Sequence, residues 1–441
     1  MIITELQQLY ATHPNVEGMC KLLKDDSVRH LYCSGLCASA ASLFSSVLVQ
    51  RAECPFVFIL GDLEEAGYFY HDLTQILGTG QVLFFPSSFR RAIKYGQKDA
   101  ANEILRTEVL SRLQKGEEGL CVVTYPDALA EKVVSRKELG DKTLKLHAGE
   151  KVDMDFVTEV LRSYGFEYVD YVYEPGQYAV RGSIIDVFSF SSEFPFRIDF
   201  FGDEVESIRT FEVESQLSRE KKEEIVIVPD LSRSLEQGGN GGMVSFLDFL
   251  RPDTLLAMRD FLWLRERIQA VHDESLTAQA IAACEAEENG AISLEGKLID
   301  GGEFTLRALD FRRMEFGTKP TGTPDATVAF STVAQPIFHK NFDLVAESFR
   351  DYLSRNYTLY ICSDSLKQTD RIRAIFEDRG DNISFTPVER TLHEGFADDT
   401  LRLCIFTDHQ LFDRFHKYNL KSDKARSGKV ALSLKELNQF T

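Results

Sequence analysis

Four short apolar segments, separated by stretches of helical character, constrain the fold of the first third of the chain. Each has three to five consecutive apolar residues and no charge, which is typical of strands buried on both faces of a parallel sheet. The stretch at 102–114, between the last two segments, has the pattern of a crossover helix. The segments lie at 31–33, 56–60, 82–85 and 120–123. This alternation predicts an α/β domain with a parallel sheet.

The pattern changes near residue 143. An amphipathic helix is expected at 155–164, ending at Gly165, with an apolar stripe formed by Phe156, Val157, Val160, Leu161 and Tyr164. Strands are expected at 183–188, 196–201 and 205–211, and the Gly202-Asp203 pair between the last two favours a hairpin turn. One helix followed by a meander indicates an inserted α+β domain at 143–225.

The α/β character returns after this insertion. A strand is expected at 255–258, a mainly helical stretch at 263–285, a loop rich in Gly and Pro at 317–324 and a strand near 328–330. A small α/β unit follows, with strands at 357–362 and 401–406 and a helix at 365–378. The predicted domains are 1–142 and 226–335, as two parts of one α/β domain, the insertion at 143–225, and a last unit at 340–441.

The charge of the chain limits the class of its partners. Its 441 residues include 50 Lys and Arg against 69 Asp and Glu, a net charge of −19. Such a surface repels phosphate backbones, so sequence-blind nucleic-acid binding is not expected as the main activity. No signal peptide is visible, and serines interrupt the uncharged stretch at 31–50, which disfavours a membrane span. We expect a cytoplasmic protein, and the abrupt end at Thr441 indicates a piece of a longer one.

The turn after the first strand resembles a phosphate-binding loop that has lost its chemistry. The P-loop pattern is G-x-x-x-x-G-K-[ST], in which the Lys neutralises the phosphates and the hydroxyl holds Mg²⁺. Here Gly35 and Ser42 are in place, but Ala40 and Ala41 stand at the Gly and Lys positions. The spacing alone leaves open a relic of a P-loop or a coincidence, and a working nucleotide site is not expected.

The other chemistry that a nucleotide site needs is also missing from the sequence. The strand at 255–258 ends in Arg259 and Asp260 where an Asp-Glu pair would hold Mg²⁺, and a lone Asp beside an Arg is more typical of a surface ion pair. No Ser/His/Asp or Cys/His catalytic set can be assembled, and the eight cysteines are too scattered for a zinc site. The residues predict a non-catalytic protein with no metal or cofactor.

Two longer motifs identify a family. Residues 173–188 (YEPGQYAVRGSIIDVF) and 196–209 (FRIDFFGDEVESIR) resemble the module shared by the excision-repair protein UvrB and the bacterial transcription-repair coupling factors. The resemblance implies a RecA-like domain that is split by the inserted α+β domain. It is strong over about residues 25–260, and weak but ordered from there to Thr441.

Two departures favour the amino-terminal region of the coupling factors over UvrB. UvrB keeps a working P-loop and an Asp-Glu motif, and both are degraded here. UvrB also inserts a long aromatic hairpin that probes damaged DNA, and the region at 85–102 is too short for it. That region contains Phe89, Arg90, Arg91, Lys94 and Tyr95. In the family, a polymerase-binding domain and an ATP-dependent DNA translocase motor would follow beyond Thr441.

The resemblance also implies a partner and its contact residues. In the family, the inserted domain binds the damage-recognition ATPase UvrA, through positions that look like Arg181, Arg197 and Phe201. Strand periodicity places Arg197 and Phe201 on the face opposite Phe196, Ile198 and Phe200. Without the resemblance, the simpler reading is that Phe201 is a core residue at the hairpin end and that both arginines are ordinary surface charges.

The implied function is a non-catalytic adaptor region that recruits UvrA to RNA polymerase stalled at DNA damage. Polymerase and DNA would be contacted by the domains beyond Thr441. A UvrB-like DNA-dependent ATPase or damage-verification module is the alternative from a different class. A third possibility is a structural module that shields the motor. Residues 340–441 have no role that the resemblance assigns.

Overall fold

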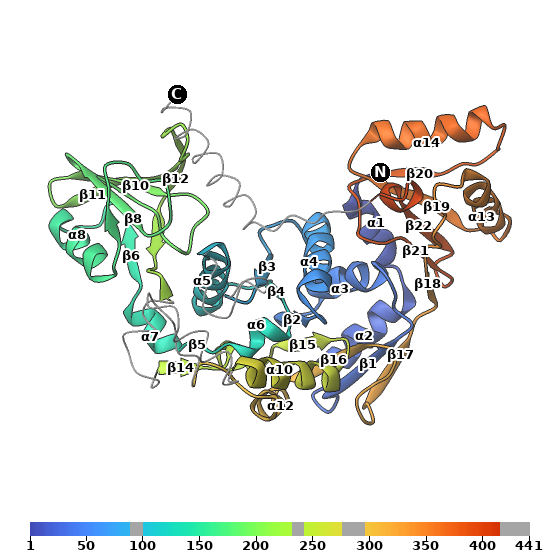
Figure 1. The fold of residues 1–441 in the computed structure, drawn as a ribbon, viewed down its shortest axis with the longest axis horizontal. Helices are drawn as coiled ribbons and strands as arrows, with labels where there is room; N and C mark the ends of the chain where they lie inside the picture. The colour runs from blue at the N-terminus through green and yellow to red at the C-terminus, as the bar shows by residue number, and fades with distance from the viewer. Residues whose placement is uncertain (89–99, 232–241, 276–295, 415–441) are drawn as a thin grey trace.

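A computed structural model describes residues 1–88, 100–231, 242–275 and 296–414. Two sheets lie at opposite ends of the molecule, on either side of a central sheet (Figure 1). Some expectations fall outside the described residues. They are the positions Phe89, Arg90, Arg91, Lys94 and Tyr95, the end of the helical stretch at 263–285, and residues 415–441 of the last unit.

The central sheet confirms the predicted α/β class. Its seven strands are parallel, in the order β17-β1-β16-β15-β2-β4-β3. They are β1 (His30–Ser34), β2 (Phe56–Ile59), β3 (Val82–Phe85), β4 (Cys121–Thr124), β15 (Leu255–Met258), β16 (Arg312–Gly317) and β17 (Ala326–Ala329). Helices α3 (Ala40–Arg51), α4 (Leu63–Leu77) and α5 (Ala100–Lys115) lie on one side, and α10 (Phe261–Ser275) and α12 (Gly301–Ala308) on the other (Figure 1).

The sequence-based prediction lacks several elements of this part, including α12. Helices α1 (Ile3–Tyr10) and α2 (Pro14–Lys24) pack against α3. Strand β16 lies between β1 and β15 although its sequence is RRMEFG, and its Glu315 side chain is fully buried there. Glu315 lies 3.0 Å from the Nε2 atom of His30 and accepts a hydrogen bond from the Thr321 amide. A charged strand of this kind lacks the apolar run used to recognise the others.

The second sheet forms the α+β part that was expected after residue 143. Its order is β12-β11-β10-β9-β8-β7, antiparallel except for the β7–β8 pair. The strands are β7 (Glu167–Tyr168), β8 (Gln177–Arg181), β9 (Ile184–Val187), β10 (Phe196–Phe201), β11 (Glu204–Phe211) and β12 (Ser218–Lys222). Helix α8 (Met154–Ser163) covers one face with Val157 and Leu161. The expected position of Phe156 on the buried stripe is wrong, because this side chain is 53% exposed.

Short paired segments join this part to the central sheet. Strand β6 (Leu144–His147) pairs with β13 (Glu224–Ile227), so the chain leaves and returns at the same place. Strand β5 (Val133–Val134) pairs with β14 (Met243–Val244) on the central side. The remaining short helices there are α6 (Pro126–Ala130), α7 (Arg136–Asp141) and the 3₁₀ turn η2 (Phe246–Phe249).

The third sheet belongs to the small carboxyl-terminal unit. Its order is β18-β21-β22-β19-β20, and its first strand begins at Thr332, ahead of the boundary expected at residue 340. The strands are β18 (Thr332–Ala334), β19 (Thr358–Ser363), β20 (Thr386–Glu389), β21 (Phe396–Asp398) and β22 (Leu403–Thr407), and the helices are α13 (Phe342–Ser354), α14 (Leu366–Asp378) and α15 (Asp408–Leu411). One buried apolar cluster runs from the central sheet into this unit and includes Leu392 and Ile405.

A membrane-spanning helix was not found in the described part of the chain, where every helix is too short or too polar to cross a bilayer.

Candidate functional site

The six-stranded sheet brings two of the three expected contact residues onto one carboxylate. Strand β9 lies between β8 and β10, so Asp186 of β9 is within reach of both arginines. The Arg197 Nε atom donates to Asp186 Oδ1 at 2.8 Å and its Nη2 atom to Oδ2 at 2.9 Å, while Arg181 donates to Oδ2. Asp186 is 1% exposed. Its hydrogen bonds raise the pKa of the Arg197 guanidinium, which therefore stays charged.

The two arginines differ in how far they reach solvent. The Arg197 side chain is only 15% exposed, lies over the Phe211 ring at 4.5 Å, and donates to the Gln216 carbonyl. Arg197 lies on the predicted face of β10, but it is mostly buried there and is not an ordinary surface charge. The Arg181 side chain is 36% exposed and lies 5.0 Å from the centre of the Tyr171 ring, which also reaches solvent. Periodicity could not reveal Asp186 as the common partner, because that depends on the strand order.

Phe201 is the most exposed large apolar residue of the described chain. Its exposed fraction is 79%, and it ends β10 just before Gly202, whose φ of +65° suits the hairpin turn. Phe196, Ile198 and Phe200 are buried, so the predicted alternation is confirmed despite an irregular register at Asp199 and Phe200. The reading of Phe201 as a core residue is wrong. Phe201, Arg181 and Arg197 together are called the arginine–aromatic face below.

The P-loop-like turn borders a cleft of about 390 Å³. Of the six residues expected at a degenerate nucleotide site, Ala41, Ser42 and Arg259 line this cleft. Gly35, Ala40 and Asp260 do not. Gly35 has a φ of +78°, and an added Cβ would lie 2.0 Å from the Phe330 carbonyl oxygen, so close backbone packing explains this glycine. Asp260 accepts a hydrogen bond from the Trp263 amide at the start of α10, so it caps a helix.

Two side chains that line this cleft, Ser42 and Arg259, are already bonded to other residues of the chain. The Ser42 hydroxyl, at the position that would hold Mg²⁺, donates to Asp72 at 2.7 Å. Arg259 forms an ion pair with Glu65. Burial raises the pKa of Asp72 to about 6. Carboxylates dominate the charged lining, which consists of Asp62, Glu64, Glu65, Asp72, Glu394 and Arg259, together with His393. These residues do not fit a nucleoside triphosphate, because the lining would repel its phosphates.

In the described part of the chain, no group of three or more His, Cys, Asp or Glu side chains is arranged so that it could hold a metal ion.

Comparison with known proteins assigns the six-stranded sheet to a class. Residues 144–232 match the family model for the UvrB interaction domain, which spans this sheet, its helix α8 and the paired segments β6 and β13. The arginine–aromatic face therefore lies within the region that matches this family model.

Relatives that align beyond this region are transcription-repair-coupling factors. The transcription-repair-coupling factor of Bacillus subtilis (strain 168) is 21% identical over 483 aligned residues, covering 93% of this chain and 41% of the relative. That of Escherichia coli (strain K12) is 29% identical over 196 residues, 44% of this chain and 17% of the relative. That of Staphylococcus aureus (strain bovine RF122 / ET3-1) is 21% identical over 481 residues. The chain is related to the amino-terminal region of these coupling factors (Mfd), as the motifs predicted, and it spans about two fifths of their length.

Proposed function

We propose that this chain is a non-catalytic adaptor that binds UvrA through the arginine–aromatic face. Within a longer coupling factor it would recruit UvrA to RNA polymerase stalled at DNA damage, in the cytoplasm. Contacts with polymerase and DNA, and ATP-driven translocation, would come from domains beyond Thr441.

The observation that carries this proposal is the exposure of Phe201 on the same sheet face as two arginines held by a buried carboxylate. An aromatic and arginines are the residue types that contribute most at protein interfaces. A Phe that is 79% exposed offers apolar area that a bound partner would cover. Since Asp186 holds Arg197 and Arg181 in fixed positions, little side-chain entropy would be lost on binding.

We also propose that the central sheet is a RecA-like domain split into residues 1–142 and 226–335. Its strands β1 to β4 come before the inserted sheet in sequence, and β15 to β17 come after it. The inserted UvrA-binding domain would be residues 143–225, and the small unit at 340–441 would follow.

The cleft supports an adaptor rather than the alternative, a UvrB-like DNA-dependent ATPase or damage-verification module. Ala41 supplies no cation, and Arg259, which stands where a Mg²⁺-binding Asp would be, is paired with Glu65. The net charge of −19 also opposes association with DNA.

A calorimetric titration of purified UvrA into the chain, with and without ATP, tests the proposal. We expect saturable binding by UvrA and no ATP turnover by the chain itself, with or without duplex DNA. DNA-stimulated ATP hydrolysis by the chain would favour the ATPase alternative. If the chain neither bound UvrA nor hydrolysed ATP, the third hypothesis, a structural module that shields the motor, would be favoured.

A further inference from the structure

A loop of the carboxyl-terminal unit forms one wall of the cleft beside the P-loop-like turn, which is called the nucleotide-like cleft below. This docking loop, residues 391–395, connects β20 to β21. The His393 amide donates to Asp72 Oδ1 at 2.7 Å, and the Glu394 amide donates to the Ser39 hydroxyl at 3.0 Å. The His393 ring stacks on the Tyr68 ring with centroids 3.4 Å apart and an interplanar angle of 12°. Two consecutive backbone amides and one ring therefore bind the cleft directly.

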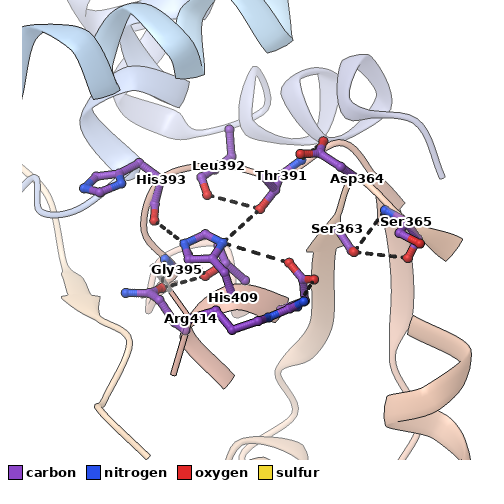
Figure 2. A network of polar contacts seen from close by, with 12 residues as sticks. Ser363, Asp364, Ser365, Thr391, Leu392, His393, Gly395, His409 and Arg414 are labelled. Atoms are coloured by element: carbon purple, nitrogen blue, oxygen red, sulfur yellow. Dashed lines mark hydrogen bonds and ion pairs between the residues drawn. The ribbon is translucent and has the colours of Figure 1, made fainter. Parts of the chain in front are cut away.

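The loop is held in this shape by its own unit, as Figure 2 shows. His409 contacts the His393 carbonyl oxygen at 2.8 Å, and the Thr391 amide donates to Asp364. The Gly395 amide donates to Gln410, and a Cβ at Gly395 would lie 2.1 Å from the Gln335 Oε1 atom. A loop fixed in this way loses little backbone entropy on docking.

The cleft, in turn, offers the loop hydrogen-bond acceptors, whereas a P-loop offers a nucleotide backbone donors and a cation. Ser39 precedes helix α3, and Ser42 lies in its first turn. Ser42 donates to one oxygen of Asp72, and the His393 amide donates to the other. Among the described residues, Asp72 forms no ion pair, so its buried carboxylate depends on neutral donors, one of which the loop provides. A buried carboxylate that lost such a donor would be costly.

Further contacts join the same two parts of the molecule away from the cleft. Tyr10 of α1 donates to Asp398 of β21 at 2.8 Å. The Glu389 amide of β20 donates to the Met1 carbonyl at 2.9 Å. Leu392, within the loop, is fully buried in the cluster that belongs to the central sheet. The loop is therefore part of a continuous interface.

We propose that the nucleotide-like cleft is an intramolecular docking site for the docking loop, and that this docking fixes the small carboxyl-terminal unit on the central sheet. The role is independent of UvrA. It assigns a function to a unit for which the sequence suggested none, and it explains why the cleft keeps two serines and a buried carboxylate without a phosphate-binding lysine.

Residue-resolved hydrogen exchange of the full chain tests this proposal. In Asp72→Ala, the amides at 393 and 394 should exchange faster by roughly tenfold or more, while those of β19 and β22 stay slow. Glu64→Ala is the matched control, because Glu64 lines the same cleft but is exposed. Unchanged exchange at 393 and 394 in Asp72→Ala would overturn the proposal.

A second variant decides the case in which Asp72→Ala unfolds the chain. His393→Ala removes the ring that stacks on Tyr68 and leaves helix α4 untouched. The proposal requires faster exchange at 393 and 394 in this variant, by roughly threefold or more, with the central strands unaffected. Exchange as slow as in the parent would mean that the loop is held by its own unit alone, and would overturn the proposal.

Discussion

The arginine–aromatic face and the nucleotide-like cleft are each organised around a buried carboxylate, but the partners differ. Asp186 is bound by two arginines of neighbouring strands, and the face around it leaves Phe201 in solvent. Asp72 is bound by a serine hydroxyl and by an amide from the far end of the chain. The face is therefore complete within its own sheet and exposed to solvent, whereas the cleft is completed by a loop from a distant part of the chain. Buried polar groups alone do not indicate a ligand site.

The largest effect is expected when the carboxylate of the face is removed. Asp186→Ala leaves the mostly buried Arg197 without its charged partner, so the inserted domain should lose about 3–5 kcal/mol of unfolding free energy. The matched control is Asp199→Ala, which removes a more exposed pair with Arg209 and should cost about 0–1 kcal/mol. Urea unfolding of both variants provides the measurement. Equal losses of unfolding free energy in Asp186→Ala and Asp199→Ala would show that the burial of Asp186 does not increase its contribution to stability.

A smaller difference should separate the two arginines. Arg197→Ala removes hydrogen bonds to a buried charge and should cost about 1.5–3 kcal/mol of stability in addition to weakening UvrA binding. Arg181→Ala should stay within about 0–1 kcal/mol, because its side chain is more exposed. Melting curves recorded beside each UvrA titration distinguish lost folding from lost contact. A stable Arg197→Ala chain would contradict the structural role given to Arg197.

The cleft should respond to pH through Asp72. Burial raises the pKa of this carboxyl from 3.8 to about 6, so the folded chain binds its proton more tightly than the unfolded chain does. This contribution to stability is complete below pH 3.8 and is lost as the pH rises to 6. Relative to Asp72→Asn, the parent should lose about 2 kcal/mol of unfolding free energy between pH 4.5 and pH 7.5. Urea unfolding of both chains across this range would contradict the account if their difference stayed constant.

The smallest expected signal is that of nucleotide at the cleft. Titration with ATP up to about 1 mM should give no saturable heat, because acidic residues dominate the lining, to which the docking loop adds Glu394. Duplex DNA should likewise bind only weakly at physiological salt. Micromolar ATP binding in the parent chain would show that the cleft is still a ligand site.

The sequence predicts those elements whose local pattern is unambiguous. The sequence places β3, β10 and β15 to the residue, because β3 and β15 are uninterruptedly apolar and β10 alternates between apolar and charged residues as far as Phe200. Strand β16 was missed because Arg312, Arg313 and Glu315 conceal its burial. The partners of the Glu315 carboxylate, the His30 ring and the Thr321 amide, are brought beside it only by the assembled fold.

The candidate sites divide in the same way. Periodicity in β10 predicts that Phe201 lies on the face opposite the core, and the structure agrees. The role of Asp186 depends on strand order, which periodicity does not give. The contact of the docking loop cannot be predicted from local sequence patterns, because His393 and Asp72 are 321 residues apart in the sequence. Contacts of that range follow from the assembled fold.

The central claim, that the arginine–aromatic face binds UvrA, is tested most directly by removing one exposed phenylalanine ring. Phe201→Ala and Phe156→Ala both remove exposed aromatic side chains of the same domain, one on the proposed face and one on helix α8. In calorimetric titrations with UvrA, Phe201→Ala should bind roughly tenfold more weakly or worse than the parent, and Phe156→Ala should bind like the parent. Both should melt like the parent, since exposed side chains change stability by only about 0.5 kcal/mol. Equal UvrA affinity of the parent and Phe201→Ala would contradict the claim.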